Sequence, residues 1–194
     1  MAMKAAEIAE IFHKTKGFLE GHFQLSSGLH SPNYMQCARV LQHPVHCERF
    51  CKDLAAKLAA FKPDVVFAPA LGGILVGYEL ARQLGVRSIF AERVDGAMTL
   101  RRGQDLFKGE RVVLCEDVVT TGKSIREIEV LANEIGAEVV ALACIVDRSA
   151  GNWKHRLPLT SLLQMDLVTY QPDACPMCQQ GLELVKPGSR PKPV

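Results

Sequence analysis

The chain has 194 residues, of which 48% are apolar and 23% charged, with a formal net charge of +2 at pH 7. These values predict one globular domain over residues 1–194 and give no reason to expect nucleic acid as a partner. No apolar run approaches the ~20 residues that span a bilayer. The N-terminus lacks the apolar centre of a signal peptide, and the seven cysteines fit scattered reduced thiols, so a cytoplasmic protein without membrane association is expected.

The N-terminal third is expected to form a helix, a hairpin and a second helix. Apolar residues at helical spacing predict an amphipathic helix over residues 4–16. Alternating apolar and polar residues around the turn signal Ser27-Gly28 predict a hairpin over residues 21–36. A helix over residues 44–60 begins with a proline, which the first turn tolerates, and Pro63 stops it.

From residue 64 onward, strands and helices alternate. Apolar strands are predicted at 65–68, 86–91, 112–115 and 138–146, with helices at 74–84 and 125–132. This alternation implies right-handed crossovers, and hence an α/β fold with a central parallel sheet flanked by helices. Residues 92–110 show little periodicity, which is typical of a functional or disordered loop. A further strand is a candidate at 162–165, and residues 186–193 are expected to fray.

The most specific chemistry lies where the strand after residue 112 ends. Two adjacent carboxylates, Glu116 and Asp117, are followed by a turn of small and hydroxyl residues at 120–124 that opens a helix. Backbone N–H groups, hydroxyls and a helix N-terminus bind anions, whereas carboxylates suit sugar hydroxyls or hydrated magnesium. A nucleoside-triphosphate loop is excluded because Asp117 stands where that motif requires glycine. The pattern predicts a site for a phosphorylated ribose; an ordinary capped helix is the alternative.

Other candidates follow neighbouring strands. Gly72 and Gly73 would let backbone amides approach a diphosphate, although two glycines before a helix are often only a tight turn. The cations of segment 92–110 would close over a polyanion, or belong to a solvated loop; they are Arg93, Arg101, Arg102 and Lys108. Arg148 would bind a carboxylate or a planar ring substituent, or form a surface ion pair with Asp147 or another acid.

Cys175 and Cys178 form half of a zinc-ribbon pattern. The other five cysteines provide no second pair, so the alternatives are a tight proline turn with two thiols and a zinc site shared between subunits. His22 and His30, like the surface histidines expected at positions 43 and 46, give no sign of being ligands.

Residues 113–124 closely resemble the phosphoribosyl-diphosphate signature of the type I phosphoribosyltransferase family. Segments 23–34, 69–73 and 146–148 extend the resemblance to the orotate phosphoribosyltransferases, and the pattern Leu-x-Ser-Gly-x-x-Ser-Pro selects that branch. The resemblance implies the type I phosphoribosyltransferase fold. Its parts would be a helix and small N-terminal hood over about residues 1–40, a substrate-binding core over about 60–150, and a C-terminal extension over 151–194.

The resemblance implies an enzyme that transfers ribose 5-phosphate from phosphoribosyl diphosphate to orotate, giving orotidine 5-monophosphate and diphosphate in pyrimidine biosynthesis. Magnesium would be the cofactor, held by Glu116 and Asp117 largely through water and substrate. The residues implied to bind phosphoribosyl diphosphate are Leu71, Gly72, Gly73, Arg93, Glu116, Asp117, Val118, Val119, Thr120, Thr121, Gly122, Lys123 and Ser124. Those implied to bind orotate are Ser26, Tyr34, Met35, Thr120 and Arg148.

The same resemblance implies a homodimer in which loop 92–110 inserts into the partner subunit's site. Asp117, Arg93, Arg101 and Arg102 would be catalytic. The chain departs from the family pattern at Ser26, where many members have lysine. It departs again at Ala97, where a lysine would assist the departing diphosphate. Either Arg101 or Arg102 replaces that lysine, or turnover is slow.

Two other functions are compatible with the sequence. A phosphoribosyltransferase for a purine base would share the signature but would not need the Ser-Gly-x-x-Ser-Pro hairpin. A non-catalytic regulator would bind phosphoribosyl diphosphate without releasing diphosphate, and the alanine at position 97 makes this alternative plausible.

Overall fold

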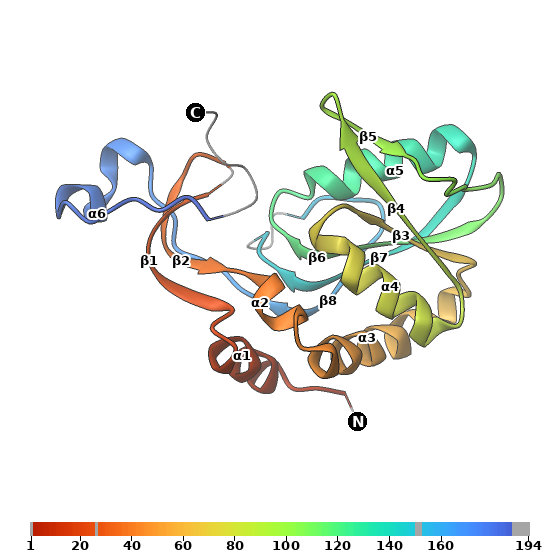
Figure 1. The fold of residues 1–194 in the computed structure, drawn as a ribbon, viewed down its shortest axis with the longest axis horizontal. Coiled ribbons are helices and arrows are strands. Elements are labelled where there is room, and N and C mark those ends of the chain that lie inside the picture. The colour runs from red at the N-terminus through yellow and green to blue at the C-terminus, as the bar shows by residue number, and fades with distance from the viewer. Residues whose placement is uncertain (1, 26, 150–152, 188–194) are drawn as a thin grey trace.

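A computed structural model describes residues 2–25, 27–149 and 153–187. In this part of the chain a six-stranded sheet lies between helices, and a two-stranded sheet stands beside it (Figure 1). The helices are α1 (Ala5–Lys14), α2 (Cys37–Leu41), α3 (Pro44–Leu58), α4 (Gly72–Leu84), α5 (Lys123–Ile135) and α6 (Pro176–Gln179), with 3-10 turns at Ala59–Phe61 and Pro172–Ala174. The strands are β1 (Phe18–Gln24), β2 (His30–Met35), β3 (Val65–Pro69), β4 (Arg87–Val94), β5 (Ala97–Leu100), β6 (Arg111–Val119), β7 (Glu138–Asp147) and β8 (Leu159–Gln164).

The central sheet has the strand order β5-β4-β3-β6-β7-β8. All its pairs are parallel except β4 with β5, and Val119 at the end of β6 pairs with Asp147 at the end of β7. The carboxyl ends of β3, β6 and β7 therefore share one edge, and ligands of open α/β sheets bind at such an edge. The predicted α/β fold is confirmed.

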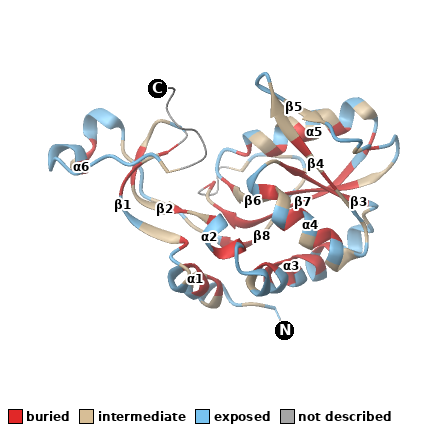
Figure 2. Ribbon diagram, in the orientation of Figure 1, coloured by how far each residue is buried: buried red, intermediate tan, exposed pale blue. Residues whose placement is uncertain are grey.

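The two faces of the sheet pack against different helices, and buried residues run along every central strand (Figure 2). Because side chains alternate along a strand, Val66 faces the α1–α4 side whereas Val65 and Phe67 face α5. In Figure 1, α3 and α4 lie below the sheet and α5 above it. The predicted helices on both faces are confirmed.

The two-stranded sheet, β1 and β2, is called the hood below. It is the hairpin predicted around Ser27-Gly28, and it is antiparallel. The C-terminal extension borders it on both strands, because Val185 bridges to Phe23 and Tyr170 bridges to His30. His22 and His30 are each only 4% exposed, because the C-terminal extension covers this part of the hood.

Segment 92–110 differs from the predicted loop. Its first half, up to Leu100, belongs to a hairpin of β4 and β5, in which Val94 pairs with Ala97. The two residues between them, Asp95 and Gly96, have positive φ angles of 48° and 89°, as a two-residue hairpin turn requires. The dipeptide Asp95-Gly96 between two short strands is the sequence signal from which this hairpin could have been predicted. Helix α2 was also not predicted.

Within the described residues, no helix is long and apolar enough to cross a membrane.

Candidate active site

The glycine turn (residues 69–73) and the two carboxylates meet at the edge where β3 and β6 end. A Cβ atom added to Gly72 would lie 2.7 Å from Oδ1 of Asp117, and one added to Gly73 would lie 3.2 Å from the carbonyl oxygen of Cys115. Side chains at these positions would push the turn away from β6, so the two glycines bring its backbone against the acid. Leu71 is 75% exposed beside them.

The hydroxyl turn (residues 120–124) connects β6 to α5. Gly122 has a φ of 70° and precedes the first residue of α5, and a Cβ there would clash with the ring of Trp153. Thr121 Oγ1 accepts a hydrogen bond from the Lys123 N–H at 3.4 Å. The apolar face of α5 anchors the turn, because Ile125 and Ile128 are fully buried. The turn therefore presents the positive end of a well-fixed helix, which suits an anion.

Glu116 and Asp117 lie in surroundings that disfavour a negative charge on either side chain. Burial raises the pKa of Asp117, although the Val118 N–H donates to its Oδ1 at 2.9 Å. Burial, and then the charges of Asp117 and Glu127, raise the pKa of Glu116 well above its usual range. In the described part of the chain no ion pair involves either carboxylate. Two uncompensated carboxylates with oxygen donors fit hydroxyl groups and a hydrated magnesium ion.

A cavity of about 520 Å³, the hood cavity, lies between the hood and the sheet edge. Four of the five predicted orotate-binding residues line it: Tyr34, Met35, Thr120 and Arg148. The fifth, Ser26, lies outside the described residues. A second cavity of about 700 Å³, the turn cavity, is lined by the hydroxyl turn, Glu116 and Arg93. The cavities adjoin, because residues 27, 118, 120 and 121 line both.

Arg148 enters the hood cavity from the residue after β7. Its Nε is buried, and among the described residues no hydrogen-bond acceptor reaches it. Burial lowers the pKa of the guanidinium, while the nearby Tyr34 and Cys37 oppose that shift. The alternative of an ion pair with Asp147 is not what the described residues show, since Asp147 Oδ1 accepts the Ser149 N–H at 2.8 Å. A buried cationic donor without a partner suits an anionic or carbonyl-bearing ligand.

The loop arginines are paired with acids of their own chain. Both Nη atoms of Arg93 contact the carboxylate of Glu127, and Nη1 also donates to the carbonyl oxygen of Gly96. Arg101 and Arg102 lie 3.6 Å and 3.2 Å from the same oxygen of Glu92. Of these three, Arg93 alone lines either cavity among the described residues.

The sequence did not point to the C-terminal extension as part of the site. Lys186 and Pro187 were expected to fray, yet both line the hood cavity; the rest of that frayed segment, residues 188–193, lies outside the described residues. Backbone hydrogen bonds hold this segment in place, because Val185 donates to the carbonyl oxygen of His22 and accepts from the Gln24 N–H, both at 2.8 Å. Backbone hydrogen bonds require no particular side chains, so the sequence of the segment shows no periodic pattern that would have predicted them.

Trp153 was also missed. Its ring packs on Gly122, and the guanidinium of Arg126 lies 4.9 Å from the centre of that ring. A single aromatic residue after a strand gives no signal of such a contact.

Comparison with known proteins gives consistent results. The model of a family described as the phosphoribosyl transferase domain matches residues 37–169. Over 188 residues the chain is 48% identical to an orotate phosphoribosyltransferase of Caldanaerobacter subterraneus subsp. tengcongensis, covering 97% of this chain and 99% of the relative. Over 183 residues it is 52% identical to the orotate phosphoribosyltransferase of Caldicellulosiruptor bescii, covering 94% and 96%. The solved orotate phosphoribosyltransferase of Aeropyrum pernix has a TM-score of 0.68 and 28% identity, covering 81% of this chain and 93% of that one.

Proposed function

The chain belongs to the phosphoribosyltransferase family, in its orotate branch, and from this premise we propose the reaction and the roles of its residues. The enzyme transfers ribose 5-phosphate from phosphoribosyl diphosphate to orotate. A nitrogen of the orotate ring bonds to the anomeric carbon as the bond from that carbon to the diphosphate oxygen breaks, and the ring nitrogen loses its proton. The products are orotidine 5-monophosphate and diphosphate, in pyrimidine nucleotide biosynthesis.

The single observation that carries the assignment is Arg148 in the hood cavity. Its buried Nε lacks an acceptor among the described residues, and a carboxylate or carbonyl oxygen of the base would supply one. Tyr34 and Met35 line the same cavity from the hood, at the position from which backbone groups would hold the pyrimidine edge. A base without an anionic substituent would leave the buried Nε of Arg148 without a full hydrogen bond, at a cost of about 1–3 kcal/mol.

The geometry supports catalysis by positioning. The hydroxyl turn holds the 5-phosphate, the glycine turn with its Gly72 contact to Asp117 faces the diphosphate, and Arg148 fixes the base. The anomeric carbon then moves between two anchored groups, so no nucleophilic side chain is needed. Arg93, and Arg101 or Arg102 once released from Glu92, would stabilise the charge that develops on the departing diphosphate.

Magnesium is proposed as the cofactor. Glu116 and Asp117 provide hard oxygen donors without an ion-pair partner among the described residues, so their chemistry fits this ion. When bound, the ion would neutralise charge on the diphosphate. Protein desalted into metal-free buffer is expected to lose turnover and to regain it on addition of magnesium. Full activity without any divalent ion would contradict this role.

A homodimer with segment 92–110 exchanged across the interface is proposed as the active form. The support is that Arg101 and Arg102 line neither cavity of their own chain among the described residues, although both lie on a segment rich in cations. If the loop binds substrate in the partner subunit's site, Arg101 and Arg102 are not needed in either cavity of their own chain.

The test is a comparison of four bases. Orotate, uracil, xanthine and hypoxanthine are each supplied with phosphoribosyl diphosphate and magnesium, and diphosphate release is measured together with nucleotide formation. Turnover with orotate alone is expected. Activity on a purine without activity on orotate would establish a purine enzyme, and binding of phosphoribosyl diphosphate without diphosphate release for any base would establish a regulator.

A further inference from the structure

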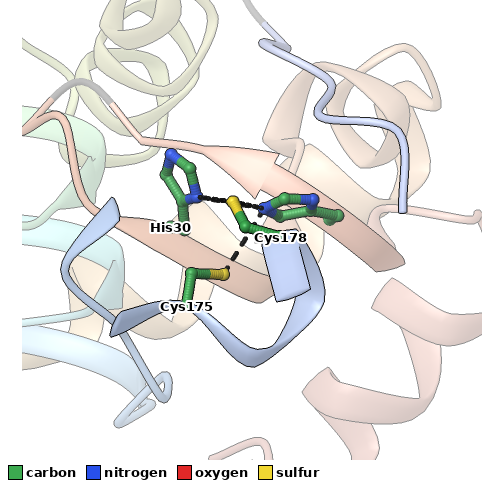
Figure 3. A group of neighbouring side chains, drawn as sticks. His30, Cys175 and Cys178 are labelled. Atoms are coloured by element: carbon green, nitrogen blue, oxygen red, sulfur yellow. Dashed lines mark hydrogen bonds between the residues drawn. The ribbon is translucent and has the colours of Figure 1, made fainter. Parts of the chain in front are cut away.

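Four side chains with metal-binding atoms meet between the hood and the C-terminal extension (Figure 3). They are His22 at the end of β1, His30 at the start of β2, Cys175 just before α6 and Cys178 within it. One ligand atom of each lies within 4.8 Å of all the others. The histidines lie far from the cysteines in the sequence: His22 is 153 residues before Cys175, and His30 is 148 residues before Cys178.

The distances match those around one tetrahedral ion. Zn–N bonds of about 2.0 Å and Zn–S bonds of about 2.3 Å place neighbouring nitrogen and sulfur ligands about 3.5 Å apart. Here Cys175 Sγ and Cys178 Sγ lie 3.5 Å and 3.6 Å from His22 Nε2, and Cys178 Sγ lies 3.3 Å from His30 Nδ1. The two ring nitrogens, His22 Nε2 and His30 Nδ1, are 3.0 Å apart.

A backbone contact orients the His22 ring so that Nε2 faces the cluster. Its Nδ1 lies 2.9 Å from the carbonyl oxygen of Leu182, which can only accept, so Nδ1 carries the proton and donates. The neutral ring then has its lone pair on Nε2, which faces the cluster. A backbone partner of this kind is what orients metal-ligating histidines. Three heteroatoms converge on that single lone pair, more than one hydrogen bond can satisfy, and an ion at their centre would account for the convergence.

The donor set also selects the metal. Two thiols with two imidazoles in a tetrahedron favour zinc, whereas magnesium and calcium take oxygen ligands. A two-iron cluster with this ligand count would hold the histidine pair and the cysteine pair on separate irons, but here His30 Nδ1 and Cys178 Sγ lie 3.3 Å apart. Both cysteines are free thiols rather than a disulfide. We propose that His22, His30, Cys175 and Cys178 form a structural zinc site within one chain.

The site has a structural purpose that the local composition makes clear. A two-stranded hairpin is marginally stable alone, and in the described stretch from residue 170 to 187 only Cys175 and Met177 are buried. So little apolar burial leaves the extension with few stabilising contacts beyond its backbone hydrogen bonds to the hood, and small units of this kind gain stability from a bound metal. Zinc would join the hood to the extension close to the hood cavity. Val185 bonds to His22, a ligand, and to Gln24, and both Gln24 and Lys186, the residue after Val185, line the cavity.

Metal analysis tests the proposal without reference to catalysis. Protein free of any histidine tag is desalted and its zinc and iron are measured per chain, and the same protein with cobalt in place of zinc is examined by absorption spectroscopy. One zinc per chain is expected, with the ligand-field bands of tetrahedral cobalt and a thiolate-to-cobalt charge-transfer band. A chain that holds neither metal, or that holds iron instead, overturns the proposal.

Matched variants assign the ligands. Cys178→Ser and His30→Gln are expected to weaken zinc retention by more than the roughly 10- to 100-fold that loss of an outer-shell partner costs. Cys47→Ala and His43→Gln change the same residue types outside the cluster and should keep one zinc per chain. Zinc that survives both ligand changes would place the metal elsewhere. If a variant fails to fold, the cobalt spectrum of the unaltered chain still decides.

Discussion

Arg148 shows how a single partly buried residue ties specificity to stability. Its side chain lines the hood cavity, and its buried Nε has no acceptor among the described residues. A buried polar donor without a partner costs free energy in the folded protein. The base is therefore expected to supply an acceptor for this Nε, so that a substitution of Arg148 should change binding of the base more than the stability of the protein.

Arg148→Met is expected to raise the KM for orotate about tenfold to hundredfold, the loss of a hydrogen bond to a charged group. The KM for phosphoribosyl diphosphate should change little. The melting temperature should stay the same or rise, because an apolar side chain replaces a cation that has no ion-pair partner among the described residues. Steady-state kinetics measure the two KM values, and thermal unfolding measures the melting temperature. Arg156→Met, at an exposed arginine that lines neither cavity among the described residues, is the control, and an unchanged KM for orotate in Arg148→Met would refute the role.

Asp117 lies between the glycine turn, which packs against its carboxylate, and the hydroxyl turn, which follows it in the sequence. Gly72 fits beside the Asp117 carboxylate only because it has no side chain, since a Cβ atom there would lie 2.7 Å from Oδ1. The Val118 N–H donates a hydrogen bond to the same oxygen and holds it in place. An asparagine keeps the shape and the acceptor oxygen but removes the charge.

Asp117→Asn should therefore weaken binding of phosphoribosyl diphosphate by about tenfold or more while leaving the fold intact. Titration calorimetry with phosphoribosyl diphosphate and magnesium measures the affinity, and circular dichroism reports the fold. Asp64→Asn is a matched control, since Asp64 is exposed and also accepts a backbone hydrogen bond, from the Arg111 N–H at 2.9 Å. Equal affinities for Asp117→Asn and the unaltered chain would remove Asp117 from the ribose site.

At the scale of elements, segment 92–110 combines a rigid start with paired charges. The β4–β5 hairpin fixes Arg93 and Ala97 close to the sheet, and ion pairs with Glu127 and Glu92 hold the loop arginines in this arrangement. The pairs are partly exposed, and such pairs contribute only about 0–1 kcal/mol. A polyanionic substrate is therefore able to compete with the two glutamates for the arginines.

The double variant Arg101→Ala/Arg102→Ala is expected to lower kcat on the order of a hundredfold, with smaller changes in both KM values, because loop cations act on the departing diphosphate. Adding Ala97→Lys to that variant should recover part of the loss, since it restores a cation at the position where relatives of this type are expected to have one. Stopped and continuous assays of diphosphate release give kcat. Lys57→Ala, at an exposed lysine of α3 that lines neither cavity among the described residues, is the control for general loss of charge, and a double variant with unchanged kcat would rule both arginines out.

At the scale of the whole molecule, the proposed exchange of segment 92–110 makes each site depend on two chains. Closed two-fold symmetry is the commonest arrangement of homo-oligomers, and it would give two equivalent sites per dimer. The C-terminal extension and the hood belong to the same chain as the hydroxyl turn, so the loop would be the only part supplied by the partner.

Subunit mixing tests this arrangement. Asp117→Asn and the Arg101→Ala/Arg102→Ala chain are each expected to be weakly active alone. After unfolding and refolding together, half of the dimers are mixed, and one of the two sites in each combines an intact turn with an intact loop, which restores about a quarter of wild-type activity. If the loop serves its own chain, mixing restores nothing. Measured activity after mixing, relative to each parent, separates the two outcomes.

The sequence alone determined the features that depend on neighbours along the chain. Alternating apolar strands and helices predicted the parallel sheet, and the acids and hydroxyl turn at 116–124 predicted an anion site beside a diol site. These patterns are readable because strand burial, helix amphipathicity and turn chemistry each involve residues within a few positions of one another. The resemblance of the same segments supplied the substrate and residue roles, and four of the five predicted orotate-binding residues line one cavity.

Only the tertiary structure decided which distant groups meet. It left Arg148 buried without an acceptor among the described residues, brought Lys186 to the hood cavity, and joined His22 and His30 to Cys175 and Cys178. The sequence showed two cysteines and no second pair, because the missing ligands were histidines on a hairpin far away along the chain. A few backbone hydrogen bonds at the edges of the hood made that contact. Such bonds do not depend on side chains, so they leave no pattern from which the contact could have been predicted.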